Sequence, residues 1–276
     1  MKIFFIGLGI MGMPMANNVA KKYDLVGYDV VKKETPFPFA SGYEYAKDAD
    51  VIISMVPKSE HFLSLFETLK PFLSGKIWID MSTISPLVNQ EVAPKAEALG
   101  GELLDCPVVK SQPAAIKGEL GIYAGGKKEV FEKVLPILSC MGKNIIYLGG
   151  HGLGLTMKIL HNALVGEIQN GVNEILGLAR DCGMDLSDVV TALGYGGASC
   201  FYLDTKANNI KNREYPTAFS VENMNKDVHF AKELAESKKR DLPGLSNVVS
   251  VYEKAMDQGL AKQDFSASYE VVNEGK

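Results

Sequence analysis

The sequence predicts an α/β protein in which a doubly wound parallel sheet is followed by an all-helical domain. Two observations support this fold class. Up to about residue 150, short strand-like runs alternate with helical stretches, which is typical of a parallel sheet with helices on both faces. After Gly149-Gly150-His151-Gly152 no convincing strand follows, and one long helical pattern begins. We therefore expect two domains, residues 1–151 and residues 152–276.

Length and composition are those of an ordinary soluble globular protein. The 276 residues suffice for two domains of moderate size, with 46% hydrophobic and 22% charged residues. A net charge of -4 gives no general attraction to nucleic acid or anionic membranes, and no apolar run approaches the ~18 residues of a membrane-spanning helix. The four cysteines are widely spaced and the N-terminus lacks a signal-peptide layout, so we expect reduced thiols and a cytoplasmic protein.

The first domain is expected to alternate strands and helices. Strands are expected at Lys2–Ile6, Asp24–Asp29, Val51–Met55, Lys76–Asp80, Glu102–Cys106, Leu120–Ala124 and Asn144–Leu148. Helices are expected at Met13–Lys22, Ser59–Lys70, Pro86–Leu99 and Val130–Met141. Two prolines in Glu34–Phe39 lie where a helix would follow the second strand, so we expect a loop there instead.

The second domain is expected to be built on one long interdomain helix. Leu155 to Cys182 contains no proline, with Gly183 as the expected C-cap. Its apolar residues recur at helical spacing: Leu155, Ile159, Ala163, Ile168, Val172, Ile175 and Ala179. Such a helix spans roughly 40 Å, so it must be covered by other helices or by a second subunit. We expect a homodimer or homotetramer through this domain, and further helices near Ser187–Leu193, Cys200–Arg213, Val221–Ser237 and Leu245–Asp257.

A glycine-rich turn follows the first strand. Gly7-Leu8-Gly9-Ile10-Met11-Gly12 matches G-x-G-x-x-G, whose glycines permit a tight turn, close approach of a pyrophosphate, and close packing of helix on strand. Asp29 ends the second strand, 22 residues after Gly7, where a carboxylate can accept the hydroxyls of an adenine ribose. The pattern predicts a Rossmann domain that binds a dinucleotide. Because Asp29 would repel a 2′-phosphate, we expect NAD rather than NADP, although Lys32 and Lys33 lie close by.

Lys158 and Asn162 are candidate catalytic residues. They are four residues apart on the long helix, hence on one face and about 6 Å apart along its axis. In a closed pocket a lysine loses stabilisation of its charge and its pKa falls, which would make it a usable proton donor to a carbonyl oxygen. The Asn162 amide can orient the lysine or the substrate oxygen without adding charge. Spacing alone does not separate this role from that of a solvated lysine on an amphipathic helix.

The sequence around these residues resembles the β-hydroxyacid dehydrogenase family, which includes 3-hydroxyisobutyrate, tartronate semialdehyde and 6-phosphogluconate enzymes. The resemblance covers nearly the whole chain, and several matches in one order are specific where any single match is weak. The matching segments are Gly7–Met15, Met55–Pro57, Asp80–Ile84, Asp105–Val108, Gly118–Leu120, Gly152–Asn162, Lys226–Asp227 and Asp264–Ala267.

The resemblance implies roles for individual residues. By it, Lys158 is the general acid/base and Asn162 is its partner. Beside the glycine-rich turn and Asp29, the residues that would contact the cofactor are Val56, Pro57 and Thr83, at its nicotinamide half, and Lys226. Those that would contact or support the substrate are Val109, Lys110, Ser111, His161, Phe219 and Asp227.

Two departures from the family pattern bear on the substrate. Where most relatives have Ser-Gly after Pro-Val, this chain has Val109-Lys110, followed by Ser111. The branch that reduces sulfolactaldehyde is similar in placing a basic residue at the position of Lys110 and a hydroxyl next to it. His161-Asn162 resembles the pair in 6-phosphogluconate dehydrogenase, but Val165 stands where those decarboxylating enzymes carry a catalytic glutamate.

The sequence therefore predicts an NAD(H)-dependent oxidoreductase that interconverts a small anionic 3-hydroxy acid and its semialdehyde. The best single candidate is a 3-sulfolactaldehyde reductase. Reduction of 3-hydroxyisobutyrate or tartronate semialdehyde, a 6-phosphogluconate-type reaction and a non-catalytic dinucleotide-sensing module remain alternatives, the last disfavoured by Lys158, Asn162, Thr83 and Asp227 together. We expect no nucleic-acid or membrane partner. We also expect no metal, because the cysteines and the histidines at positions 61, 151 and 229 lack ligand spacing.

Overall fold

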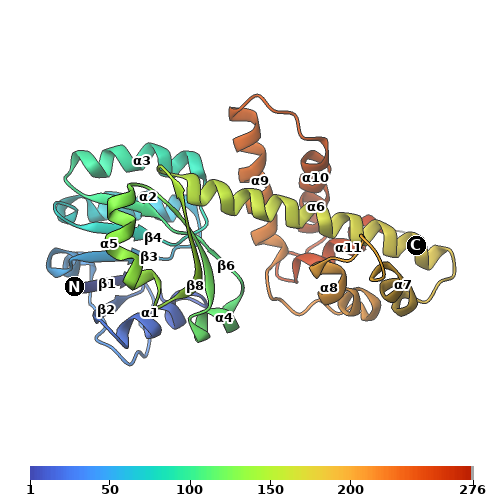
Figure 1. The fold of residues 1–276 in the computed structure, drawn as a ribbon, viewed down its shortest axis with the longest axis horizontal. Helices are drawn as coiled ribbons and strands as arrows, with labels where there is room; N and C mark the ends of the chain where they lie inside the picture. Colours follow the sequence, from blue (N-terminus) through green and yellow to red (C-terminus); the bar gives the residue numbers. More distant parts are fainter. Residues whose placement is uncertain (275–276) are drawn as a thin grey trace. The chain divides into compact units, whose positions relative to one another are not determined.

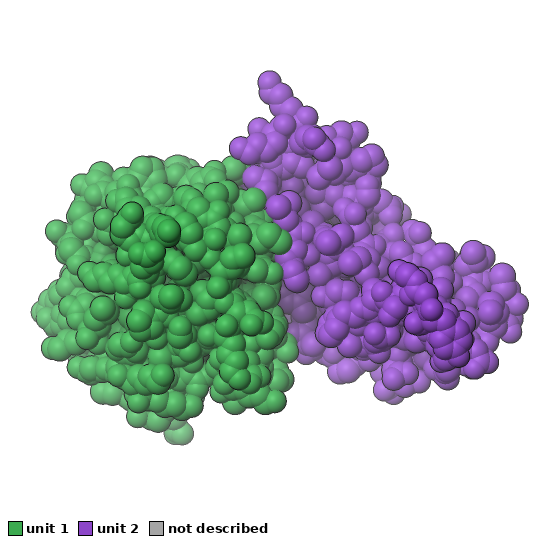
Figure 2. Space-filling view, viewed as in Figure 1, with its two compact units in different colours: residues 1–158 green, residues 159–276 purple. Residues whose placement is uncertain are grey.

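The structure is a computed structural model in which residues 1–274 are described. It divides into two compact units, one comprising Met1–Lys158 and the other beginning at Ile159 (Figure 2). The division falls inside α6 (Leu153–Asp181), which begins in the first unit and continues into the second. The boundary expected from the sequence, between residues 151 and 152, lies just before this helix. Each unit has its own buried core.

Within the described residues, eight strands form one sheet at the centre of the first unit (Figure 1). The hydrogen-bonded strands follow one another in the order β2-β1-β3-β4-β5-β7-β6, and β8 also pairs with β7. The strands are β1 (Lys2–Ile6), β2 (Asp24–Tyr28), β3 (Val51–Ser54), β4 (Ile77–Asp80), β5 (Glu102–Asp105), β6 (Val108–Val109), β7 (Leu120–Gly125) and β8 (Gly142–Gly149). β2, β1, β3, β4 and β5 are parallel in register, which confirms the doubly wound α/β fold.

The other side of the sheet is mixed. β7 runs antiparallel to β5 and β6, whereas β8 is parallel to β7. The connection from β5 to β7 contains α4 (Gln112–Lys117), and neither this helix nor β6 was expected from the sequence. Six residues of helix span only about 9 Å, less than the ~20 Å of a six-residue strand. The chain therefore reverses direction here instead of crossing over to start another parallel strand.

Helices cover both faces of the sheet and divide its core in two. On one face lie α1 (Gly12–Ala20), α4 and α5 (Lys128–Leu138). On the other lie α2 (Ser59–Leu69) and α3 (Pro86–Ala98), together with Leu155 from the start of α6. Trp78 of β4 is fully buried there, and its ring stacks on Phe62 and Phe66 at centroid distances of 4.9 and 6.4 Å.

The segment after β2 is a loop, as the two prolines predicted. A 3₁₀ turn at Tyr43–Asp48 (η1) takes the place of a full helix. The loop returns alongside β2, where Gly27 N donates to Pro38 O (2.9 Å) and Ala40 N donates to Gly27 O (2.8 Å). A side chain at Gly27 would lie 2.5 Å from the Phe37 ring, so glycine allows the loop to pack this closely.

The described residues 159–274 form a helical unit with one isolated bridge, between Ser220 and Asp264. Within residues 1–274 no helix has the length and apolar character needed to cross a bilayer. Besides the greater part of α6, the unit contains α7 (Leu186–Leu193), α8 (Phe201–Asn212), α9 (Val221–Ser237), α10 (Pro243–Asp257), η3 (Phe265–Ala267) and α11 (Ser268–Val272). The bounds of α6 agree with the sequence-based prediction to within two residues.

Ile175, one of the apolar residues that recur at helical spacing along α6, does not pack in the core of the unit. Its side chain is 50% exposed, and polar residues occupy much of the buried face of α6. Asn173, for example, lies within hydrogen-bond distance (2.9 Å) of Ser268 Oγ in α11. The amide of Gln169 in turn bonds Asn173 (2.7 Å). Some of the polar partners on this face come from α11, a helix too short to be expected from the sequence.

An apolar stripe remains exposed on α6. It consists of Leu160, Leu164, Ile175 and Leu178, each 50–61% exposed. Their spacings of 4, 11 and 3 residues place them on one side of the helix. Apolar surface of this kind is typical of a subunit interface, so we propose that a second copy of the chain covers it.

Light scattering is therefore expected to give about twice or four times the 30.0 kDa chain mass at micromolar concentration. Ile175→Glu should shift the protein toward one chain mass, because it introduces a charge into the interface. Ile116→Glu, at a 59% exposed isoleucine of α4, is the matched control and should leave the mass unchanged. A wild-type mass near 30 kDa would contradict the assembly.

Candidate active site

The glycine-rich turn between β1 and α1 has the shape needed to hold a pyrophosphate. Gly7 has a φ of +94°, and a Cβ there would lie 2.2 Å from Met55 O. A Cβ at Gly12 would lie 1.9 Å from Gly7 O. By contrast, a Cβ at Gly9 would have no heavy atom of the described chain within 4 Å. Packing thus requires the first and third glycines, while the second leaves open space beside the N-terminus of α1, where backbone N–H groups attract phosphate.

Asp29 is fixed beside this turn. Its Oδ2 accepts a hydrogen bond from Leu8 N (2.7 Å), and its Oδ1 accepts one from Val31 N (3.0 Å). The carboxylate is therefore oriented by the backbone at the carboxyl end of β2. A carboxylate has about four acceptor positions, so both oxygens retain capacity for ribose hydroxyls. The turn and Asp29 together fit a dinucleotide.

A buried polar network ties together the ends of β3 and β4, near the residues expected to contact nicotinamide. Asp80 Oδ1 accepts hydrogen bonds from Ser54 Oγ (2.6 Å) and Ser82 Oγ (2.7 Å). Ser82 Oγ in turn accepts one from Val56 N (2.8 Å). Burial raises the pKa of Asp80 to about 6, and the two serine hydroxyls oppose that rise. This network fixes the backbone of Val56. Because Ser82 belongs to the network, it also fixes the backbone at the adjacent residue, Thr83.

Sequence reasoning gave Asp80 and the two serines no role. The available signal was the presence of polar residues at the carboxyl ends of two adjacent buried strands, where ligands of α/β sheets bind. Pro57 and Thr83 lie at the same two strand ends, directly after Val56 and Ser82. The structure therefore brings the expected nicotinamide-contacting residues of the first unit to neighbouring strands, β3 and β4.

The N-terminus of α6 is capped by a buried carboxylate from β5. Asp105 Oδ1 accepts a hydrogen bond from Gly152 N, and Oδ2 accepts one from Leu155 N, each at 2.8 Å. Burial raises the pKa of Asp105 to about 7; the two N–H groups oppose the rise, and the charge of Asp80 adds to it. Lys158 follows Leu155 by one turn and is 8% exposed. The candidate acid/base is thus a buried lysine on an anchored helix.

Three predicted residues of the second unit meet in one cluster. Asn162 Nδ2 donates a hydrogen bond to Asp227 Oδ2 (2.6 Å), and Lys226 Nζ lies 3.3 Å from the other carboxylate oxygen. Asp227 is almost completely buried, and the Lys226 ammonium lies 5.6 Å from the centre of the Phe230 ring. Asp227 therefore fixes the Asn162 amide. His161, next to Asn162 on α6, is half-buried.

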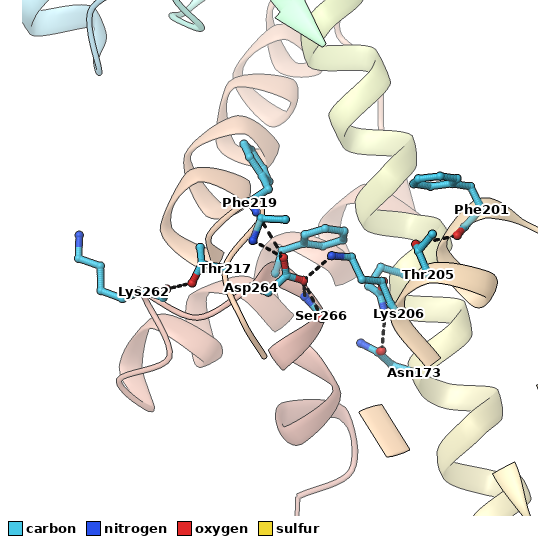
Figure 3. Close-up of polar contacts among 12 residues, drawn as sticks. Asn173, Phe201, Thr205, Lys206, Thr217, Phe219, Lys262, Asp264 and Ser266 are labelled. Atoms are coloured by element: carbon cyan, nitrogen blue, oxygen red, sulfur yellow. Dashed lines mark hydrogen bonds and ion pairs between the residues drawn. The ribbon is translucent and has the colours of Figure 1, made fainter. Parts of the chain in front are cut away.

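Phe219 lies on a segment held by another buried carboxylate, that of Asp264 (Figure 3). Asp264 Oδ2 accepts hydrogen bonds from Ala218 N (3.1 Å) and Phe219 N (3.3 Å). Its Oδ1 lies 2.9 Å from Lys206 Nζ and accepts a hydrogen bond from Ser266 Oγ (2.7 Å). The Phe219 ring packs edge-on against Phe265 at 6.2 Å. Asp264 thus fixes the backbone of an expected pocket residue, a role that sequence reasoning did not assign.

The expected substrate loop, Val109-Lys110-Ser111, has an unusual backbone. Lys110 has a φ of +78°, a conformation that favours glycine and costs a non-glycine residue of order 1–3 kcal/mol. Its Nζ donates a hydrogen bond to Glu119 O (2.8 Å) at an exposed position. Val109 packs so closely on β7 that a Cβ at Gly121 would lie 2.4 Å from its Cγ2. The Lys110 ammonium therefore rests on the chain's own backbone, with Ser111 exposed beside it.

Two family models match the chain in succession. Residues 2–149 match the NAD binding domain of 6-phosphogluconate dehydrogenase. Residues 152–272 match a second model, described as NAD-binding of NADP-dependent 3-hydroxyisobutyrate dehydrogenase.

Individual relatives match over nearly the whole chain. Mouse mitochondrial 3-hydroxyisobutyrate dehydrogenase is 32% identical over 98% of this chain and 86% of that protein. The 2-hydroxy-3-oxopropionate reductase of Escherichia coli K12 is also 32% identical, over 97% of this chain and 95% of its own. An NAD-dependent L-serine dehydrogenase of Pseudomonas aeruginosa is 30% identical, over 96% and 95%. Among solved structures, Mycobacterium tuberculosis 3-hydroxyisobutyrate dehydrogenase with L-serine superposes with a TM-score of 0.90, at 26% identity and 98% coverage of both chains.

Proposed function

The chain belongs to the β-hydroxyacid dehydrogenase family, oxidoreductases that act on CH–OH groups with NAD(P) as acceptor, and on that premise we propose its reaction. The protein interconverts a small anionic 3-hydroxy acid and its semialdehyde, with Lys158 as the general acid/base. The observation that carries this proposal is the buried Lys158 on a helix whose next turn presents Asn162, itself fixed by Asp227.

Each group in the proposed reaction has a defined task. When bound, the nicotinamide ring accepts or supplies the hydride. The glycine-rich turn would hold the pyrophosphate of the cofactor and Asp29 its adenine ribose, while Val56, Pro57 and Thr83 would line the nicotinamide half. In the reductive direction Lys158 donates a proton from Nζ to the carbonyl oxygen; in the oxidative direction its neutral amine accepts the hydroxyl proton. Asn162 orients the reacting oxygen by a neutral hydrogen bond.

We infer that NAD is preferred over NADP because the Asp29 carboxylate lies at the end of β2 beside the glycine-rich turn. The kcat/KM for NADH is expected to exceed that for NADPH by at least about tenfold, roughly 1.4 kcal/mol of discrimination. Asp29→Asn should reduce the ratio, because it removes the charge that repels a 2′-phosphate. Asp24→Asn, at the exposed opposite end of β2, is the control. Equal use of both cofactors by the wild type would contradict the inference.

For the substrate we propose a strong anion, with 3-sulfolactaldehyde as the best single candidate. Support comes from a full positive charge at Lys110, on a loop whose backbone conformation favours glycine. The Lys110 ammonium now donates to a neutral carbonyl, Glu119 O. An anionic oxygen is a stronger acceptor, worth about 1.5–3 kcal/mol in a charge-assisted hydrogen bond, so a substrate anion can replace the carbonyl.

Lys110→Ala is expected to raise the KM for the true substrate by about tenfold or more and to leave NADH binding intact. Lys117→Ala removes an exposed lysine of the adjoining α4 and should leave the KM unchanged. Steady-state kinetics of both variants decide the role of Lys110. An unchanged KM for Lys110→Ala would show that Ser111 and backbone N–H groups hold an ordinary carboxylate.

A carboxylate substrate is the second candidate, because the relatives described above are named after 3-hydroxyisobutyrate, 2-hydroxy-3-oxopropionate and L-serine. These three compounds and 3-sulfolactaldehyde, each assayed with NAD(H), form the test panel. A clear preference for 3-hydroxyisobutyrate over the sulfonate would overturn the sulfonate proposal. A decarboxylating reaction of the 6-phosphogluconate type is disfavoured, since Val165 is a buried apolar residue in the core of the second unit.

A further inference from the structure

Asp105 is a buried carboxylate to which the proposed reaction gives no role. It ends β5, and its two oxygens accept hydrogen bonds from Gly152 N, directly before α6, and from Leu155 N in the first turn of α6. The first N–H groups of a helix have no partner within the helix, and the helix dipole makes this end positive. An acceptor with two oxygens and a negative charge therefore satisfies two donors at once and holds the helix start against the sheet.

Two glycines let the start of α6 approach the ends of β5 and β7 more closely than a residue with a side chain would allow. A Cβ at Gly154, in the first turn of α6, would lie 2.4 Å from Tyr123 O and 2.7 Å from Asp105 O. A Cβ at Gly125, at the end of β7, would lie 2.6 Å from Asp105 Oδ1 and 2.8 Å from Gly154 N. The first turn of α6 is thus in direct contact with the ends of β5 and β7. Its position cannot shift without breaking these contacts.

The anchored turn immediately precedes the lysine. Lys158 lies three residues after Leu155, whose side chain is fully buried in the core beneath α2 and α3. Resting on the proposed function, we propose that Asp105 is a positioning residue for proton transfer: by fixing the first turn of α6, it fixes where Lys158 lies.

Asp105→Asn tests this proposal with little change in volume. The asparagine keeps one oxygen as an acceptor, but its NH₂ group replaces the other oxygen. Two donors, this NH₂ group and a backbone N–H, then face each other without an acceptor. We expect kcat on the fastest of the four panel substrates to fall at least tenfold, while the KM and the Kd for NADH change less than threefold. Hydrogen exchange at the Gly152 and Leu155 amides should accelerate at least tenfold, a readout that is independent of turnover.

Two further variants separate positioning from stability. Leu138→Ala removes a fully buried side chain of α5 and should lower the melting temperature but keep the wild-type kcat. Gly154→Ala keeps the carboxyl group but crowds the same anchor, because its Cβ would lie 2.4 Å from Tyr123 O and 2.9 Å from Asp105 Oδ2. It should reproduce the loss of kcat with NADH binding retained. Faster exchange with an unchanged kcat, or failure of both anchor variants to fold, would overturn the positioning role. If Lys158→Ala keeps its turnover, the proposed function fails instead, and the exchange result still reports on the anchor.

Discussion

Replacement of Lys158 by alanine is expected to lower kcat by about 10²–10⁴-fold, the usual contribution of a positioned general acid/base. The lysine is buried on α6, and its proposed task is proton exchange with the reacting oxygen rather than cofactor binding. The affinity for NADH should therefore barely change. Steady-state kinetics and a fluorescence titration with NADH measure the two quantities separately.

Lys158→Arg sharpens this experiment because it keeps the positive charge on a side chain only slightly longer than that of lysine. A guanidinium does not lose its proton at working pH, so it cannot accept the hydroxyl proton in the oxidative direction. We expect it to be nearly as slow as Lys158→Ala with alcohol and NAD. A Lys158→Ala variant that keeps most of its turnover would show that another group is the proton donor, with His161 the next residue to test.

The second large effect is expected on stability, from the buried ion pair between Lys206 and Asp264. Asp264→Ala should lower the free energy of unfolding by about 3–5 kcal/mol, because it leaves a mostly buried ammonium without its counter-charge. It also removes the acceptor for Ala218 N and Phe219 N. Lys206→Met should cost less, about 1–3 kcal/mol, since the carboxylate retains its backbone and hydroxyl donors.

Denaturant unfolding measures both losses. Glu222→Ala, which breaks the exposed pair with Lys262 in the same unit, is the control and should change stability by no more than about 1 kcal/mol. Equal losses for Asp264→Ala and Lys206→Met would contradict the proposed asymmetry. They would indicate that the charge pair, and not the four donors from the backbone and Ser266, dominates at this position.

The long elements were predictable because their periodicity is set locally. The parallel strands, the bounds of α6 and the loop after β2 all follow from apolar spacing, glycines and prolines. The short elements were not predictable. β6, α4 and α11 contain two to six residues, which are too few to show a period. The polar partners that the buried face of α6 has in α11 were therefore not foreseen either.

The candidate site shows a similar division. The glycine-rich turn was predictable because its first and third glycines have no room for a side chain, while its second leaves open the space that a phosphate needs. The tasks of Asp80, Asp105 and Asp264 were not predictable. What a buried carboxylate holds depends on its hydrogen-bond donors, and several of these lie far away in the sequence. Gly152 N and Leu155 N, for instance, lie 47 and 50 residues beyond Asp105. Resemblance located these residues within matching motifs but did not say what each one holds.

The loop that replaces a helix after β2 also protects the sheet against uncontrolled growth. β2 is an outermost strand, and an exposed edge of this kind can pair with a strand of another molecule. Here the segment around Phe39 forms a parallel bridge to Gly27 and occupies backbone groups that an intruding strand would need. Pro36 and Pro38 have no N–H to offer to a further strand. The irregular segment thus terminates strand addition on this side and lowers the tendency of the protein to aggregate edge to edge.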